Sequence, residues 1–333
     1  MKLALDIASS MVFWRRRYPA NRAPKTPRPI SLDNCASTKR DIASLAPDWI
    51  DAGFLQPTGG VLHTLSFERS QCRRLRSIDI HVWTGPVPEG SFYELGDGVL
   101  IESPPFMFLQ AATILDLPTL VAFGDELCGL YCFDEREERG FSRRKKPLTS
   151  KAALRSYLAQ AVGCRGRRQS LQALQYLIER SASPMETYDE ITMCFPYVRG
   201  GYCLLQPVMN HPVPLNWKAA RIAKRKTCYL DLGYPDHHLD VEHHGKLDHA
   251  SDEAKTSDFA RVNALKEMDY EVIELTWEQV GDLFSYEYIV QRVARILGKR
   301  LPRQVLGATE ERLQLRRALA AWNASSGHVR SDV

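Results

Sequence analysis

The sequence predicts an α/β (α+β) fold whose C-terminal part is built around a small mixed sheet. Residues 203–244 contain three short strand-like stretches with short connections, which predict an antiparallel meander. A charged amphipathic stretch at residues 251–268 predicts a helix, and residues 271–277 predict a final strand. Because a helical crossover joins parallel strands, the fourth strand should lie parallel to the third. The expected order is helix, three-stranded meander, helix, strand.

Length and composition are those of a soluble globular protein. The chain has 333 residues, enough for two domains, and 44% of them are apolar and 25% charged. No run approaches the roughly 20 apolar residues of a membrane span. The arginines at residues 15–17 follow the early apolar run instead of preceding it as in a secretory signal. We therefore expect a cytoplasmic protein with no membrane partner.

The eight cysteines are scattered along the chain, unlike the dense disulfide framework of small secreted domains. Cys128 and Cys132 have no second pair of ligands at the spacing of a zinc ribbon, so we interpret them as core thiols. The sequence therefore predicts reduced, buried cysteines.

Two regions precede the predicted helices. Residues 14–30 hold five arginines, one lysine and four prolines, so we interpret residues 1–31 as a flexible basic arm. Residues 32–146 are predicted to form a mixed α/β region of unknown role, with a strand at residues 78–83. Residues 134–147 have almost no apolar side chains, which predicts an exposed linker at the end of this region.

Helical periodicity marks the middle of the chain. A first helix is expected at residues 103–115, where Ser103 can cap the N-terminus and a proline follows in the first turn. Residues 149–161 and 168–180 then show apolar side chains at helical spacing. We interpret residues 147–180 as a helical connector.

The tetrapeptide SPME at residues 183–186 predicts the start of the next region. Ser183 can cap a helix, Pro184 suits its first position, and Glu186 can close a capping box by reaching back to the Ser183 amide. This helix opens a domain at residues 181–300, and residues 301–333 form a C-terminal helix and tail. Strands or helices are expected in these two parts at residues 203–208, 228–234, 239–244, 285–298 and 309–322.

Two acids on neighbouring strands are the candidate catalytic groups. Asp231 stands alone between the apolar residues of its strand, and a buried charge needs a partner or a metal ion. If residues 234–238 form a hairpin turn, Asp231 and Glu242 come within reach of each other. Two converging carboxylates suit Mg²⁺ or Mn²⁺, which can activate water and bind a phosphate.

The order of these residues resembles that of the PD-(D/E)XK nuclease fold, and within it the very-short-patch-repair endonuclease-like domains of unknown function. Residues 181–187 and 200–210 also resemble the version of this domain in bacterial proteins similar to AbiEi-type antitoxins and regulators. The resemblance covers residues 150–300. The positions that match the pattern are Asp231, Glu242, His249, Asp258, Arg261, Leu265, Tyr270 and Val272.

The resemblance implies a role for each matched position. Asp231 and Glu242 would bind Mg²⁺ or Mn²⁺, and His249 would transfer a proton or contact a phosphate. His244 stands where this family carries Asp and the broader fold Lys, and Asp269 stands where the family favours Gly. Three further residues would support the site: Glu186, Asp258 and Arg261.

Other interpretations of these residues remain open. Asp231 and Glu242 could be acids neutralised by nearby cations, and His244 could be a hydrogen-bonded histidine of a decayed site. Asp258 and Arg261 lie three residues apart on a helix, where a structural ion pair is expected. A zinc cluster of His243, His244 and His249 is disfavoured, because strand alternation sends the adjacent histidines to opposite faces.

Bunched cations precede the strand that carries Asp231, and they would contact backbone phosphates without reading sequence. The predicted function is a metal-dependent endonuclease that hydrolyses DNA phosphodiesters, with RNA as a possible substrate. The alternative is a catalytically impaired regulator that binds nucleic acid or a partner protein of a toxin–antitoxin system. The predicted nucleic-acid-binding residues are Lys218, Arg221, Lys224, Arg225 and Lys226.

Overall fold

The computed structural model describes most of the chain and shows a mixed α/β protein with several small sheets. Among the residues that it describes, no helix is both long enough and apolar enough to span a membrane. Side chains are described from residue 256 onwards in the helix that begins at residue 252, and the side chain of His244 is not described. The described residues are 2–16, 32, 35–36, 41, 61–67, 78–96, 98–244 and 252–327.

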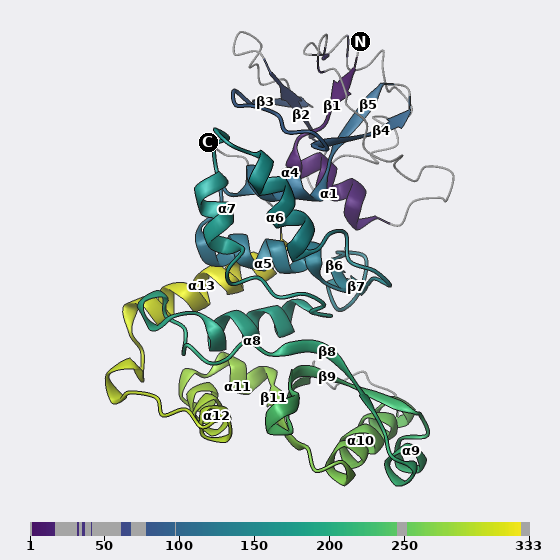
Figure 1. Ribbon diagram of the computed structural model, residues 1–333, viewed down its shortest axis with the longest axis vertical. Coiled ribbons are helices and arrows are strands. Elements are labelled where there is room, and N and C mark those ends of the chain that lie inside the picture. The colour runs from purple at the N-terminus through teal and green to yellow at the C-terminus, as the bar shows by residue number, and fades with distance from the viewer. Residues whose placement is uncertain are drawn as a thin grey trace.

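In the described residues, the N-terminal part contains two small sheets and helix α1, at the top of Figure 1. One sheet has the order β1-β5-β4, with β1 parallel to β5, and the other is the parallel pair β2-β3. The elements are β1 (Leu3–Ala4), α1 (Ile7–Arg15), β2 (Leu62–Ser66), β3 (Ile78–Val82), β4 (Phe92–Gly96) and β5 (Val99–Glu102).

The prediction of a flexible arm over residues 1–31 is wrong for residues 2–16. These residues form β1 and α1, and Leu3, Ile7 and Phe13 are buried in the apolar cores. Arg15, one of the cations of the predicted basic arm, forms a bidentate pair with the buried Glu126 at 2.7 and 2.8 Å. The remainder of the predicted arm, residues 17–31, lies outside the described residues.

A layer of helices follows in the middle of the molecule. Its helices share one large apolar core with residues of the C-terminal part. The predicted exposed linker at residues 134–147 contains part of a hairpin, and the predicted helix at residues 168–180 ends at Ala173. The elements are α4 (Pro104–Ala111), α5 (Leu117–Cys128), β6 (Tyr131–Phe133), β7 (Phe141–Arg143), α6 (Lys151–Gln160) and α7 (Arg167–Ala173).

The C-terminal part contains a four-stranded sheet of order β11-β10-β9-β8. Strand β9 is antiparallel to β8 and β10, and β11 is parallel to β10, so the predicted meander and parallel pair are confirmed. In Figure 1, α8 lies above this sheet, and α9 and α10 lie below it. The elements are α8 (Pro184–Cys194), β8 (Val208–Pro214), α9 (Trp217–Ala223), β9 (Thr227–Tyr234), β10 (Leu239–His244), α10 (Asp252–Glu267) and β11 (Glu271–Thr276).

The first predicted strand of the meander was misplaced. Residues 203–207 have no regular structure, and Cys203 has a positive φ of 53°, which is incompatible with an extended strand. Leu204 is buried in the core, and this accounts for the apolar pattern that suggested a strand. The short helix α9 between β8 and β9 was not predicted.

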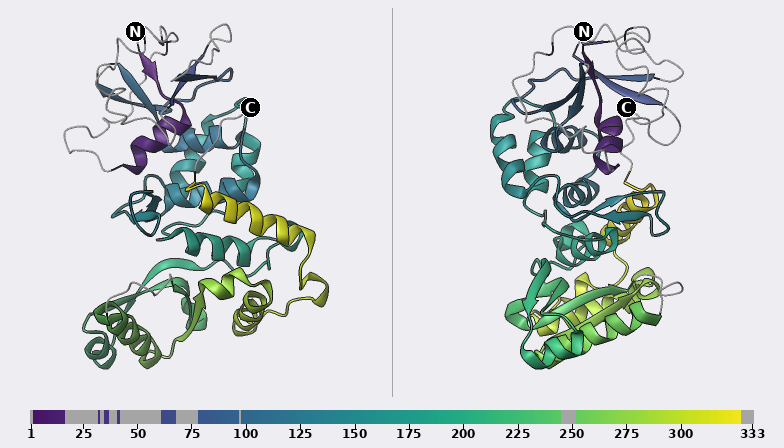
Figure 2. Two further views of the ribbon diagram at one scale, coloured as in Figure 1. Left: turned by 180° about the vertical axis from the view of Figure 1, so that it is seen from behind. Right: turned by 90° about the vertical axis from the view of Figure 1, so that its right-hand side faces the viewer.

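The last helices return to the middle layer. Helix α13 (Glu310–Ala324) follows α11 (Trp277–Gly281) and α12 (Leu283–Ile296), and it lies along α5 and α8 (Figure 2, left). The ring of Trp322 packs edge-on against Phe123 at 6.0 Å and Phe133 at 6.2 Å.

All cysteines in the described part of the chain are free thiols. Cys128, Cys132, Cys164 and Cys228 are buried, as predicted, but Cys35, Cys194 and Cys203 are partly exposed. Cys128 ends α5 and Cys132 lies in β6.

Candidate functional site

The register of β9 and β10 brings the two predicted catalytic acids together. Asp240 pairs with Gly233 and Val241 with Leu232, and this is where the pairing of the two strands ends. Continuing the register by one residue places Asp231 opposite Glu242. The pairing of β9 with β10 therefore allows the predicted approach of Asp231 and Glu242 across the hairpin.

Arg261 of α10 neutralises Glu242. Its Nη1 atom lies 2.7 Å from Oε1 of Glu242, and its Nη2 atom donates a hydrogen bond of 2.8 Å to Oε2. Burial lowers the pKa of Arg261, but the charges of the surrounding acids, with that of Glu242 the largest, outweigh burial and leave the pKa raised. Asp258 is exposed and acts on Arg261 only through its charge, which is one of those that raise the pKa of the arginine, whereas the ion pair that Arg261 forms is with Glu242 of β10.

Glu242 is buried and titrates near neutral pH. Burial raises the pKa of its carboxyl group to about 7, because Arg261 offsets only part of the cost and the charge of Asp231 acts in the opposite direction. Near pH 7, the protonated and the deprotonated forms of Glu242 are therefore both populated.

Asp240 is a member of the cluster that the sequence interpretation missed. Its side chain is fully buried, and neither carboxylate oxygen has a hydrogen-bond partner among the described residues. Burial, followed by the charges of Glu242 and Asp231, raises its pKa well above the usual value. When it holds a proton, Asp240 can donate a hydrogen bond to Glu242. Strand alternation placed Asp240 on the face of Glu242, and this was the signal available in the sequence.

Glu186 approaches the cluster from α8. Its carboxylate accepts a hydrogen bond of 2.8 Å from the amide of Ala182, and the Glu186 amide donates to Ser183 Oγ at 3.1 Å. The predicted capping box is corrected in one detail, because the glutamate reaches the Ala182 amide instead of that of Ser183. Burial and then the charge of Asp231 raise the pKa of Glu186 to about 8.

The cluster therefore holds more acid than base. Asp231 interacts electrostatically with Asp240 and Glu242 on β10 and with Glu186 on α8. Positive charge comes from Arg261 beside Glu242 and from Arg143, which acts on Glu186. The excess of carboxyl groups must be balanced by protons or by a cation. Oxygen donors of this kind suit Mg²⁺ or Mn²⁺, and the residues that could hold such an ion are Asp231, Asp240 and Glu242.

The histidines that follow Glu242 are only partly described. The side chain of His244 and the whole of His249 lie outside the described residues. His243 points to the opposite face from Glu242, where its Nδ1 atom lies 2.9 Å from Oδ2 of the fully buried Asp189 on α8. His243 is thus engaged by an acid of α8, in keeping with the alternation that disfavoured a shared zinc ion for adjacent histidines.

The predicted basic residues form an exposed surface next to the cluster. Lys218, Arg221, Lys224, Arg225 and Lys226 are all exposed on α9 and the turn that follows it. Arg225 donates a hydrogen bond of 2.7 Å to Ser257 Oγ of α10, one turn of helix before Arg261. We call these five residues the basic surface.

Aromatic side chains accompany this surface, and they were not singled out from the sequence. Trp217 is 69% exposed, Phe259 of α10 is 70% exposed and Tyr229 of β9 is 48% exposed. Lys218 Nζ lies 6.0 Å from the centre of the Trp217 ring. Exposed rings beside cations are a common arrangement where proteins bind unpaired bases and phosphates.

Searches with protein-family models, among curated proteins and among solved structures find no match to this chain.

Proposed function

We propose that the C-terminal part, residues 181–300, is a metal-dependent endonuclease that hydrolyses DNA phosphodiesters. The observation that carries this proposal is the fully buried Asp240, whose carboxyl group has no hydrogen-bond partner among the described residues other than the neighbouring acid Glu242. The order of helix, meander, helix and strand, with acids on the two central strands, agrees with the resemblance to the PD-(D/E)XK fold. The bound ion would be Mg²⁺ or Mn²⁺.

The residues of the cluster would have different roles in the hydrolysis. Asp231, Asp240 and Glu242 would hold the ion, which when bound lowers the pKa of water and stabilises the charge that develops on the phosphate. Glu186, with a pKa of about 8, is mostly protonated at neutral pH and would serve there as a proton donor. Arg261 neutralises Glu242 in the free protein. A bound ion would neutralise Glu242 instead, and Arg261 would then be able to contact a phosphate oxygen.

The basic surface would hold the substrate backbone. Its cations are exposed, and Arg225 is tied to the same helix that carries Arg261. Phosphate contacts of this kind give affinity without sequence preference. The exposed Trp217 and Phe259 would favour a substrate with unstacked bases, so single-stranded and double-stranded DNA should be compared.

Incubation of the purified chain with DNA and Mg²⁺ or Mn²⁺ tests the proposal. We expect cleavage by the wild type, and its loss in Asp231→Asn and Glu242→Gln, which keep the side-chain shapes. Glu278→Gln, at an exposed acid of α11, is the matched control and should cleave like the wild type. Absence of cleavage by the wild type, or cleavage that survives Glu242→Gln, would overturn the proposal.

A regulator that binds without cleaving is the second candidate, and the bidentate contact of Arg261 with Glu242 favours it. Both oxygens of Glu242 are engaged by the guanidinium, so the charge that an ion would compensate is already compensated. Such a chain would bind DNA or RNA, or a partner protein of a toxin–antitoxin system as the resemblance to AbiEi-type proteins suggests. Salt-sensitive binding of nucleic acid with no cleavage in Mg²⁺ or Mn²⁺ would support this candidate.

A further inference from the structure

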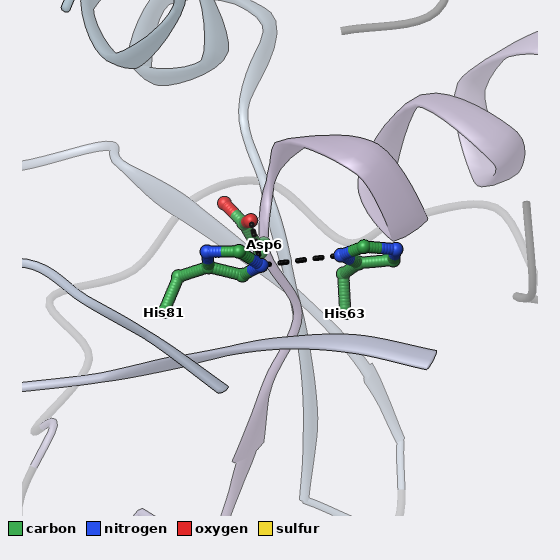
Figure 3. Close-up of side chains that lie close together, drawn as sticks. All are labelled: Asp6, His63 and His81. Carbon is green, nitrogen blue, oxygen red and sulfur yellow. Dashed lines mark hydrogen bonds and ion pairs between the residues drawn. The ribbon is translucent and has the colours of Figure 1, made fainter. Parts of the chain in front are cut away.

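Three side chains from separate segments meet in the N-terminal part, away from the carboxylate cluster. Asp6 follows β1 and caps α1, His63 lies on β2, and His81 lies on β3 (Figure 3). Asp6 is 1% exposed, and both histidines are partly buried. The junction of β1 and α1 is thus joined to the β2-β3 pair by polar side chains.

The potential ligand atoms of these side chains converge. His63 Nδ1 lies 3.1 Å from His81 Nε2, and His81 Nε2 lies 3.5 Å from Asp6 Oδ2. One ligand atom from each residue lies within 4.8 Å of the other two. The imidazole rings are nearly parallel, with 13° between their planes and 5.4 Å between their centres, and His63 Nδ1 faces His81 Nε2 (Figure 3).

Asp6 is held so that one oxygen can face the histidines. Its Oδ1 atom accepts hydrogen bonds from the Ile7 amide and from Gln110 Nε2, each at 2.6 Å. Its Oδ2 atom has no hydrogen-bond partner among the described residues, and its contact is with His81. The helix cap and the amide of α4 therefore fix the carboxylate, and the second oxygen points into the cluster.

The surroundings favour a positive charge. Asp79 Oδ2 lies 3.9 Å from His81 Nε2. Glu102 is fully buried within electrostatic reach of Asp6, and its carboxylate oxygens have no hydrogen-bond partner among the described residues. The buried carboxyl groups of Asp6 and Glu102, beside two imidazole rings, would be stabilised by a bound cation.

We propose that Asp6, His63 and His81 bind a divalent transition-metal ion, with Zn²⁺ as the expected ion. In a tetrahedral zinc site with bonds of about 2.0 Å, neighbouring ligand atoms lie about 3.3 Å apart. The separations of 3.1 and 3.5 Å bracket this value. A site with two imidazole nitrogens disfavours Mg²⁺ and Ca²⁺, because these ions prefer oxygen ligands.

The ion would add a cross-link between elements that already share backbone hydrogen bonds, such as that from the Asp6 amide to the His63 carbonyl oxygen at 3.1 Å. β1 and α1 supply the carboxylate, and the two histidines come from strands whose sheet has two members, β2 and β3. Three protein ligands leave a fourth position for a water molecule or an added ligand. Without an ion, His63 Nδ1 and His81 Nε2 would share a hydrogen bond, and zinc titration distinguishes the two cases.

Zinc titration of the full, metal-free chain tests this site by calorimetry. Asp6→Asn is the sharpest variant, because its amide oxygen can still accept from Ile7 and Gln110 while its NH₂ group replaces the ligand oxygen. We expect this variant, His63→Gln and His81→Gln each to weaken zinc binding at least about tenfold. His211→Gln, a substitution of a histidine on β8, is the control and should bind zinc like the wild type.

Thermal unfolding provides the second readout. Zinc should raise the Tm of the wild type and of Glu242→Gln, but not that of Asp6→Asn, because binding to the folded state alone stabilises it. The result for Glu242→Gln separates this site from the carboxylate cluster, so the two proposals can fail independently. Equal zinc affinity and equal thermal shifts in the wild type and Asp6→Asn would overturn the proposal.

Discussion

Arg261 of α10 contacts both carboxylate oxygens of Glu242, which lies on the central strand β10. The two distances are 2.7 and 2.8 Å. The carboxylate is 1% exposed and the guanidinium 15% exposed, so the pair is shielded from screening by salt. Removal of one partner of such a pair leaves the other charge buried without compensation. The resulting loss of folding free energy is larger than the net contribution of the intact pair.

Arg261→Gln should destabilise the protein at neutral pH. Loss of the buried partner of Glu242 should lower the free energy of unfolding by about 3 kcal/mol. The double variant Arg261→Gln, Glu242→Gln should recover part of this loss, because the charge of Glu242 is then no longer left without its partner. Urea denaturation measures both effects, and a double variant no more stable than Arg261→Gln would contradict the pairing.

Affinity of the carboxylate cluster for Mn²⁺ should rise with pH. Glu242, with a pKa of about 7, and Glu186, with a pKa of about 8, are largely protonated in mildly acidic solution. Carboxylates bind the ion in their deprotonated form, so binding must release protons below these values. Calorimetry in buffers of different ionisation enthalpy, from about pH 6 to about pH 9, measures both affinity and proton release. Affinity independent of pH would exclude these two glutamates from the site.

Burial of Glu186 should make the stability of the protein fall as pH rises. Its folded-state pKa of about 8 lies above its unfolded value, so its protonated form favours the folded state. This contribution is fully present below the unfolded pKa and is lost as pH rises through about 8, at about 1.4 kcal/mol per unit of pKa difference.

Glu186→Gln removes this titration and should therefore flatten the dependence of unfolding free energy on pH between about 5 and about 8. Glu137→Gln, at an exposed acid in the turn between β6 and β7, provides the comparison and should keep the wild-type dependence. A profile for Glu186→Gln that is indistinguishable from that of Glu137→Gln would show that Glu186 is not protonated in the folded protein.

Neutral substitutions on the basic surface should weaken binding of DNA and its dependence on salt. Lys224→Ala and Lys226→Ala each remove one cation from the phosphate backbone, which should reduce the slope of log affinity against log salt by about 0.9. Lys146→Ala, an exposed lysine after β7, should leave the slope unchanged. Fluorescence anisotropy at several salt concentrations, with Mg²⁺ omitted to prevent cleavage, measures the slope. Equal slopes for all three variants would place the bound backbone elsewhere.

Local signals in the sequence predicted local structure well. Ser183, Pro184 and Glu186 marked the start of α8, and Ser103 marked the start of α4, because capping depends on neighbours in sequence. The alternation of side chains along β10 placed His243 and Glu242 on opposite faces, as found.

Contacts between distant segments could not be predicted in the same way. The pattern of α10 shows that Arg261 and Asp258 lie near each other, but not that the arginine reaches across to Glu242. The apolar sequence at residues 203–205 resembles that of a strand, although Cys203 has a positive φ and Leu205 is exposed. The meeting of Asp6, His63 and His81 depends on three segments far apart in sequence, and no spacing rule connects them.

The return of α13 to the middle layer constrains the order of events during synthesis. Arg312 is 1% exposed and stacks 3.8 Å from the centre of the Tyr202 ring, and it donates hydrogen bonds to Glu287 and to the carbonyl oxygen of Gly200. Helix α13 also covers parts of α5 and α8. These surfaces stay exposed to solvent until α13 has left the ribosomal tunnel. Closure of this core must therefore await the synthesis of α13, and a chaperone that binds apolar segments would act during that interval.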